Sequence, residues 1–136
     1  MIILDTGAMF SYLVTSDPHH EDVASIFAAN RDGFVLSPFV IAELDYFVMT
    51  RLGVSTELVL LADIASGAYE LPVLSAADLI ACAGIIEKYA DQWVGVTDAS
   101  LVVLAERYQT RRICTLDHRH FGVMRASDGT RFELLP

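Results

Sequence analysis

The sequence predicts an α/β protein with a mainly parallel central sheet that helices cover on both faces. Short apolar runs with the length of strands alternate along the chain with longer segments of helical periodicity. Because strands that are separated by helices need crossover connections, this alternation favours parallel pairing. At 136 residues, 54% of them hydrophobic, the chain has the size of a single domain, residues 1–136, and enough apolar side chains to bury a core.

The first half of the chain contains two predicted strands and four predicted helices. The segment 1–4 is an unbroken apolar run, which is typical of a strand buried on both faces. Ser37 and Pro38 are helix start signals, and Gly53 is a stop signal. Ser55 is then expected to cap the next helix. The predicted elements of this half are the strands 1–4 and 34–36 and the helices 8–14, 18–30, 38–52 and 55–65.

The second half continues the alternation. Ser75 and Asp78 have the spacing of a capping box, which predicts a helix start. After Asp98, apolar residues recur at intervals of three and four, which indicates another helix. A strand follows that ends in Asp117. The predicted elements of this half are the strands 69–73, 112–116 and 132–135 and the helices 76–89 and 99–106.

Three aspartates stand at the ends of predicted elements. Asp5 and Asp117 each directly follow a strand, at the sheet edge where open α/β proteins usually place their ligand chemistry. Asp98 stands at a helix start. Each position has a simpler explanation, because aspartate is common in turns and also complements the positive end of a helix.

Glu43 lies inside the helix predicted for residues 38–52. At helical spacing it shares a stripe with Phe39 and Phe47, one turn before it and one turn after it. We therefore expect Glu43 to be enclosed between aromatic side chains and to need a partner. The alternative is a partly exposed glutamate whose carboxylate reaches past its neighbours to solvent.

Together the acidic residues predict one metal site. Clustered carboxylates repel one another and raise one another's pKa, so such a set is tolerated mainly where divalent cations neutralise it. Ligands that are all oxygen favour Mg²⁺ or Mn²⁺ over zinc. Cys82 and Cys114 are expected to be reduced residues of the core, outside any metal site. The four candidate acids are Asp5, Glu43, Asp98 and Asp117.

The charge distribution bears on whether the partner is a nucleic acid. The net charge of -9 argues at first against RNA, because phosphate contacts require lysine or arginine. Six of the nine basic residues, however, fall in the last thirty positions. Arg119 and Arg112 are the candidate RNA contacts, and Arg119 ranks first because it lies two residues after Asp117. The simpler alternative is that these arginines pair with acids or face solvent.

The sequence also bears on location. No segment approaches the ~18 to 20 uninterrupted apolar residues of a membrane span. The first residues form a strand and lack the positively charged start of a signal peptide. We therefore expect a cytoplasmic protein with no membrane partner.

Four segments carry a resemblance to a known family. In order, they are Ile-Ile-Leu-Asp-Thr, Ser-Pro-Phe-Val-Ile-Ala-Glu-Leu, Thr-Asp-Ala-Ser-Leu-Val-Val-Leu-Ala-Glu and Ile-Cys-Thr-Leu-Asp-His-Arg-His-Phe. No one of them is decisive, but their order closely resembles that of PIN-domain ribonucleases, and within that superfamily the VapC-type toxins of bacterial toxin-antitoxin pairs. The resemblance spans nearly the whole chain and implies a PIN-like three-layer α/β/α fold.

The resemblance implies an endoribonuclease that uses bound Mg²⁺ or Mn²⁺ to activate water for attack on an RNA phosphodiester. In that family pattern Asp5, Asp98 and Asp117 are the direct or water-mediated metal ligands. Glu43 orients the attacking water or a ligating water, and Thr6 is a hydrogen-bond donor beside them. Whether one or two metal ions act stays open.

The same resemblance implies partners. The expected substrate is a loop of structured RNA, in transfer RNA or ribosomal RNA, although the cleavage sequence depends on groove shape that a sequence does not reveal. A VapB-type antitoxin is expected to hold the protein inactive by lying across the active-site groove. A homodimer is expected as well.

Other functions remain as alternatives. A noncatalytic PIN-like module that binds RNA or protein is the main one, and the presence of all four acids favours catalysis over it. A phosphoaspartate receiver would need a lysine at a strand end, whereas the only lysine is Lys88 within a helix. The roles of His118, His120 and Asp91 stay open, with proton donation considered for the histidines and a solvated helix end for Asp91.

Overall fold

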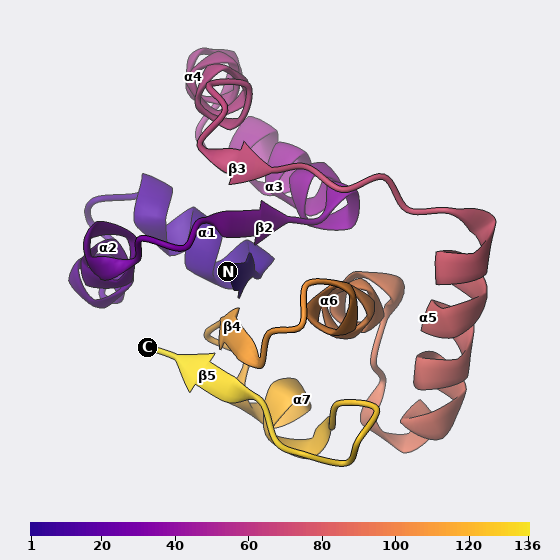
Figure 1. Cartoon of the computed structure of the whole chain (residues 1–136). Helices are drawn as coiled ribbons and strands as arrows, with labels where there is room; N and C mark the ends of the chain where they lie inside the picture. The colour runs from indigo at the N-terminus through magenta and orange to yellow at the C-terminus, as the bar shows by residue number, and fades with distance from the viewer.

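Five short strands form the central sheet of the computed structural model, which describes residues 1–136 (Figure 1). They are β1 (Ile2–Leu4), β2 (Phe34–Leu36), β3 (Tyr69–Glu70), β4 (Arg112–Cys114) and β5 (Glu133–Leu135). Their order in the sheet is β3-β2-β1-β4-β5, and every neighbouring pair is parallel. The predicted α/β class is confirmed, and the sheet is parallel throughout.

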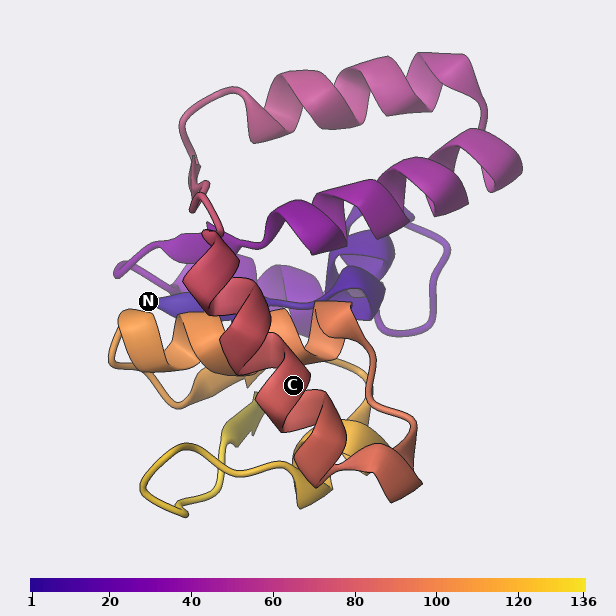
Figure 2. The same cartoon turned by 90° about the vertical axis from the view of Figure 1, so that its right-hand side faces the viewer.

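Seven α-helices and one short 3₁₀ helix connect the strands. They are α1 (Thr6–Leu13), α2 (His20–Ala29), α3 (Pro38–Arg51), α4 (Val54–Ile64), α5 (Ala76–Lys88), η1 (Ala90–Gln92), α6 (Val96–Arg107) and α7 (His118–Val123). In Figure 1, α1 and α2 lie on one side of the sheet, and α6 lies on the other with α5 packed outside it. The helices α3 and α4 pack side by side at the β3 end of the molecule (Figure 2).

Strand β1 runs through the centre of the core. Ile2, Ile3 and Leu4 are completely buried between β2 and β4, which explains why this strand is apolar without alternation. Both cysteines are buried and free, as expected. None of the helices has the length and apolar character that a membrane span requires.

The order in which the chain adds strands to the sheet reverses between β1 and β4. From β1 it adds β2 and then β3 on one side, and it afterwards crosses to add β4 and β5 on the other. Connections that leave two neighbouring strands in opposite directions open a crevice at their carboxyl ends. The N–H of Asp5 donates to the carbonyl of Cys114 (3.0 Å), so the ends of β1 and β4 are joined at this point.

Two helix starts differ from the prediction because of their capping groups. Helix α1 begins at Thr6, two residues before Ala8, since the carboxylate of Asp5 accepts a hydrogen bond from the Thr6 N–H (2.7 Å). The prediction that Ser55 caps α4 is wrong. Gly53 is the N-cap, and its φ of 86° lies in the left-handed region that glycine adopts without strain.

The segment after β4 differs most from the prediction. The strand was expected to reach residue 116, whereas β4 ends at Cys114, and the helix α7, which was not predicted, follows it. Asp117 caps this helix, and its carboxylate accepts a hydrogen bond from the His120 N–H (2.9 Å). A helix of six residues is too short to produce a periodicity that a sequence would reveal.

The remaining differences are smaller. Helix α6 begins at Val96, three residues before the predicted start, so that Asp98 lies within its first turn. Strand β3 ends at Glu70, before Pro72, which has no N–H to donate to a ladder. The short helix η1 was not predicted. All other predicted elements have the expected type, with boundaries within two residues.

Candidate active site

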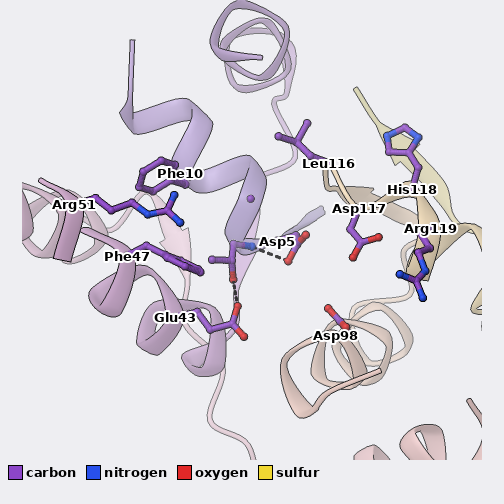
Figure 3. A pocket seen from close by; sticks show the side chains of 12 residues that line it. Asp5, Phe10, Glu43, Phe47, Arg51, Asp98, Leu116, Asp117, His118 and Arg119 are labelled. Atoms are coloured by element: carbon purple, nitrogen blue, oxygen red, sulfur yellow. Dashed lines mark hydrogen bonds between the residues drawn. The ribbon is translucent and has the colours of Figure 1, made fainter. Parts of the chain in front are cut away.

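A pocket of about 690 Å³ opens at the carboxyl edge of the sheet, beside the reversal between β1 and β4 (Figure 3). All four acids that the sequence singled out line it, namely Asp5, Glu43, Asp98 and Asp117. The other lining residues are Thr6, Gly7, Phe10, Phe47, Arg51, Leu116, His118 and Arg119. Segments that lie far apart in the sequence therefore meet at one pocket.

Asp5 is the most buried of the four acids, with 7% of its surface exposed. One of its carboxylate oxygens accepts a hydrogen bond from the Thr6 N–H (2.7 Å) and the other from the Thr115 hydroxyl (2.6 Å). Burial raises the pKa of Asp5 to about 6 in spite of these hydrogen bonds, and the nearby charges of Asp98 and Glu43 raise it further. The ionised form of Asp5 is thus less favourable than that of an exposed aspartate, and a nearby positive charge would stabilise it.

Thr115 is a site residue that sequence reasoning missed. It is completely buried, its hydroxyl donates to Asp5 (2.6 Å), and the same oxygen accepts a hydrogen bond from the Asp117 N–H (2.9 Å). One hydroxyl therefore links the aspartates that follow β1 and β4. Its position two residues before Asp117 is the feature of the sequence that could have identified it as a site residue. A threonine near a strand is, however, more often a simple packing residue.

Glu43 reaches the pocket from α3, though not in the predicted way. The buried residues of this helix are Val40, Leu44 and Val48. Glu43 lies on the exposed side, so the expectation that it is enclosed between Phe39 and Phe47 is wrong, whereas the expectation that it needs a partner is met. The Thr6 hydroxyl donates to the Glu43 carboxylate (2.7 Å), which holds that carboxylate at the pocket (Figure 3).

Two buried serines position α3 against α6. Ser37 is the N-cap of α3 and Ser100 lies in α6, and their hydroxyl oxygens are 2.8 Å apart in a hydrogen bond. The Ser100 hydroxyl donates to the carbonyl of Thr97 (2.6 Å), in the first turn of the same helix. Because the starts of the two helices are joined in this way, Glu43 and Asp98 face the same pocket.

His120 lies between two of the acids. Its Nδ1 is 2.9 Å from an oxygen of Asp117 and 3.3 Å from an oxygen of Asp98, although neither contact has the angles of a hydrogen bond. Burial raises the pKa of Asp98, and the neighbouring His120 counteracts this rise. His118 lines the pocket, whereas Asp91 in η1 does not.

Arginines flank the pocket, but not both of those predicted. Arg119 lines it, and so does Arg51 at the end of α3. Arg51 was not anticipated, although it lies two turns after Glu43 and so on the same face of the helix. Arg112 begins β4 and therefore lies at the opposite edge of the sheet, where it is 3.8 Å from Glu133. Its placement does not support the predicted contact to RNA at this pocket.

The donors at the pocket have the chemistry that suits a hard divalent cation. None of the four carboxylates forms an ion pair with lysine or arginine. As the side chains stand, no group of three or more acids, histidines or cysteines is close enough to hold a metal ion together. In Figure 3, however, the carboxylates of Asp5, Asp98 and Asp117 point toward a common space, into which a bound cation would draw them.

Comparisons with known proteins agree with this architecture. Residues 2–125 match the family model of the PIN domain. The chain is 46% identical over 135 residues to ribonuclease VapC26 of Mycobacterium tuberculosis (strain ATCC 25618 / H37Rv), a match that covers 99% of this chain and 100% of that protein.

Solved structures resemble the chain over most of its length. Mycobacterium tuberculosis VapC20, a toxin that cleaves the sarcin-ricin loop, has a TM-score of 0.84 at 15% identity and full coverage of both chains. VapBC2 from Rickettsia felis, bound to a DNA fragment from its promoter, has a TM-score of 0.70 at 18% identity, also with full coverage. FitAcB from Neisseria gonorrhoeae has a TM-score of 0.64 at 20% identity, covering 98% of this chain and 97% of that one. At such identities these structures show a shared fold.

Proposed function

From its membership in the PIN-domain family, to which the chain belongs, and within it in the VapC ribonucleases, we propose that the protein is a divalent-metal-dependent endoribonuclease. We propose that it acts as the toxin of a toxin-antitoxin pair. The observation that carries the proposal is the single pocket at the reversal of the sheet, which is lined by Asp5, Glu43, Asp98 and Asp117. The proposed substrate is a loop of structured cellular RNA, in transfer RNA or ribosomal RNA.

The proposed roles follow from where each side chain lies. Asp5, Asp98 and Asp117 would hold Mg²⁺ or Mn²⁺, because they point toward one space and lack basic partners other than His120. Such a cation supplies charge neutralisation, a more acidic water and stabilisation of the developing negative charge on the phosphate. Glu43, held by Thr6, accepts a hydrogen bond from the attacking water and orients it toward phosphorus.

The proposed partner is a VapB-type antitoxin. Structural neighbours of the chain include a toxin-antitoxin complex from Klebsiella pneumoniae and VapBC2 from Rickettsia felis. A protein that covers the pocket would keep RNA from the carboxylates. We also propose that the chain forms a homodimer and acts in the cytoplasm.

Cleavage of RNA by the purified protein tests the proposal. We expect cutting in Mg²⁺ or Mn²⁺, none in EDTA, and a loss of about a thousandfold in Asp98→Asn, since several kcal/mol of charge stabilisation depend on the ligands. Asp91→Asn is the matched control, because Asp91 is an exposed acid outside the pocket, and it should cleave normally. Full activity of Asp98→Asn, or of the wild-type protein in EDTA, would contradict the proposal.

The identity of the RNA requires a second measurement. Sequencing of RNA 5′ ends after brief expression without antitoxin would show new ends at the target loop in the wild type and none in Asp98→Asn. RNA that binds the wild type in Mg²⁺ and stays intact would instead indicate the noncatalytic binding module.

Thr115 provides a prediction about positioning. Thr115→Val keeps the shape of the side chain but leaves the Asp5 carboxylate and the Asp117 N–H without a shared partner. We expect cleavage to fall by about 10- to 100-fold and the free energy of unfolding to fall by about 1 to 3 kcal/mol. Thr115→Ser keeps the hydroxyl and should recover most of both, as measured by initial rates and urea unfolding. Full cleavage and unchanged stability in Thr115→Val would show that the hydroxyl does not position the two aspartates.

A further inference from the structure

One end of the pocket is formed by residues that have no proposed role in binding the metal ion or orienting the attacking water. Phe10 lies one turn after Thr6 on α1, and Phe47 and Arg51 lie one and two turns after Glu43 on α3. All three line the pocket. The two helices therefore extend the site away from the carboxylates in the same direction.

The guanidinium of Arg51 lies against both aromatic rings (Figure 3). Its Cζ lies 4.9 Å from the ring centroid of Phe47 and 5.5 Å from that of Phe10. The two rings themselves meet edge to face, with centroids 6.4 Å apart. A guanidinium above aromatic faces is attracted by the ring electrons and keeps its edge free for hydrogen bonds. The rings thus orient the donors of Arg51 without occupying them.

Arg51 has no anionic partner within the protein. It takes part in no ion pair, and neither does Arg119 on the other side of the carboxylates. In a chain of net charge -9, an arginine without an acid beside it is a position where an anion from outside can bind. The acids of the pocket lie between these two free cations (Figure 3).

We propose that Arg51, held against Phe10 and Phe47, is a phosphate-binding subsite for single-stranded RNA, separate from the position of the scissile phosphate. Two turns of helix separate Arg51 from Glu43, about 12 Å along the axis, so Arg51 contacts a phosphate other than the one that is cut. A planar guanidinium matches two phosphate oxygens, and the rings hold it in place for that contact. The proposal rests on the proposed ribonuclease function and adds the path of the RNA strand across the site.

Binding of intact RNA tests this subsite directly. The Asp98→Asn background prevents cleavage, and fluorescence anisotropy with a labelled single-stranded RNA of mixed sequence gives the Kd over a range of KCl concentrations. Arg51→Ala should raise the Kd by about tenfold and lower the salt slope of log Kd by about 0.7, as expected when one fewer phosphate is neutralised. Arg31→Ala is the matched control, since Arg31 is an exposed, unpaired arginine outside the pocket, and it should change neither value.

The role of the rings needs its own variants. Phe47→Leu keeps apolar bulk but removes the ring face, so it should weaken RNA binding only while Arg51 is present. The double variant Phe47→Leu/Arg51→Ala should bind no more weakly than Arg51→Ala. Ile80→Ala, the loss of an exposed apolar side chain on α5 outside the pocket, is the control and should have no effect.

Two outcomes would overturn the subsite. In the first, Arg51→Ala leaves the Kd and the salt slope unchanged while the wild type still cleaves RNA, as expected if this end of the pocket only receives a protein partner. In the second, Phe47→Leu and Arg51→Ala weaken RNA binding additively. That result would show that the Phe47 ring does not act by holding Arg51 in place. Failure of the ribonuclease function itself is seen separately, as absence of cleavage by the wild type in Mn²⁺. In the cleaving protein, Arg51→Ala should raise KM and leave kcat nearly unchanged.

Discussion

The Asp5→Asn variant should lose RNA cleavage by about a thousandfold or more, and yet be more stable than the wild type at neutral pH without divalent cations. Both effects have one cause, the negative charge of a buried carboxylate among other carboxylates. The substitution removes a proposed metal ligand, and it also removes a charge that the metal-free fold tolerates poorly. Asparagine has nearly the same shape, so the Thr6 N–H keeps an acceptor.

The gain in stability should depend on pH in a defined direction. Because the pKa of Asp5 rises from 3.8 to about 6 on folding, the folded state binds more protons between these values. The stability of the wild type therefore falls as the pH rises through this range, by about 3 kcal/mol in total. Asparagine does not titrate. The advantage of Asp5→Asn should be full above about pH 6 and absent below about pH 4.

Urea unfolding in EDTA at several pH values measures this advantage. Asp91→Asn is again the control, because Asp91 is exposed and should give no pH-dependent gain. If Asp5→Asn were less stable than the wild type at neutral pH, the hydrogen bond from Thr115 would outweigh the cost of the buried charge. In that case the idea that the cluster needs a cation would lose its energetic basis.

Addition of Mg²⁺ or Mn²⁺ should stabilise the wild-type protein, by about 2.7 kcal/mol at a concentration of one hundred times the Kd. For a domain of this size that corresponds to a rise in Tm of roughly 10 °C. The reason is that, in the proposed site, the cation would neutralise Asp5, Asp98 and Asp117 only where the fold brings them together. Thermal unfolding with increasing cation concentration at neutral pH measures the effect.

The stabilisation should weaken as the pH falls through about 6, since protons then compete with the cation for Asp5. Asp98→Asn should bind the cation more weakly and need a higher concentration for the same rise in Tm. Asp91→Asn should respond as the wild type does. An unchanged melting curve at cation concentrations that support cleavage would argue against a metal site formed by these carboxylates in the free protein.

Local patterns in the sequence were enough to identify most of the elements and all four acids of the pocket. An unbroken apolar run can only be a buried strand or a short buried helix, and a serine followed by proline starts a helix in either setting. Such features depend on neighbouring residues, and they held in β1 and α3.

The errors concern features that depend on distant residues. The apolar pattern of α3 is compatible with burial of either face of the helix. Packing against other elements buries Val40 and Leu44, and this orientation leaves Glu43 exposed. Arg112 and Arg119 are close in sequence, but the strand between them carries them to opposite edges of the sheet. Helix α7 lacks the length to show a pattern and forms because Asp117 caps it.

The sequence by itself identified the elements and the four acids that line the pocket, because hydrophobic runs, caps and acids at element ends are local properties of the chain. Only the tertiary structure decided how these residues meet. The order β3-β2-β1-β4-β5 puts β1 beside β4, and that adjacency lets Thr115 hold Asp5 and Asp117 together. The same packing turns Arg51 toward the pocket and Arg112 away from it, since strand order and helix docking are set by burial of the whole core and not by any one segment.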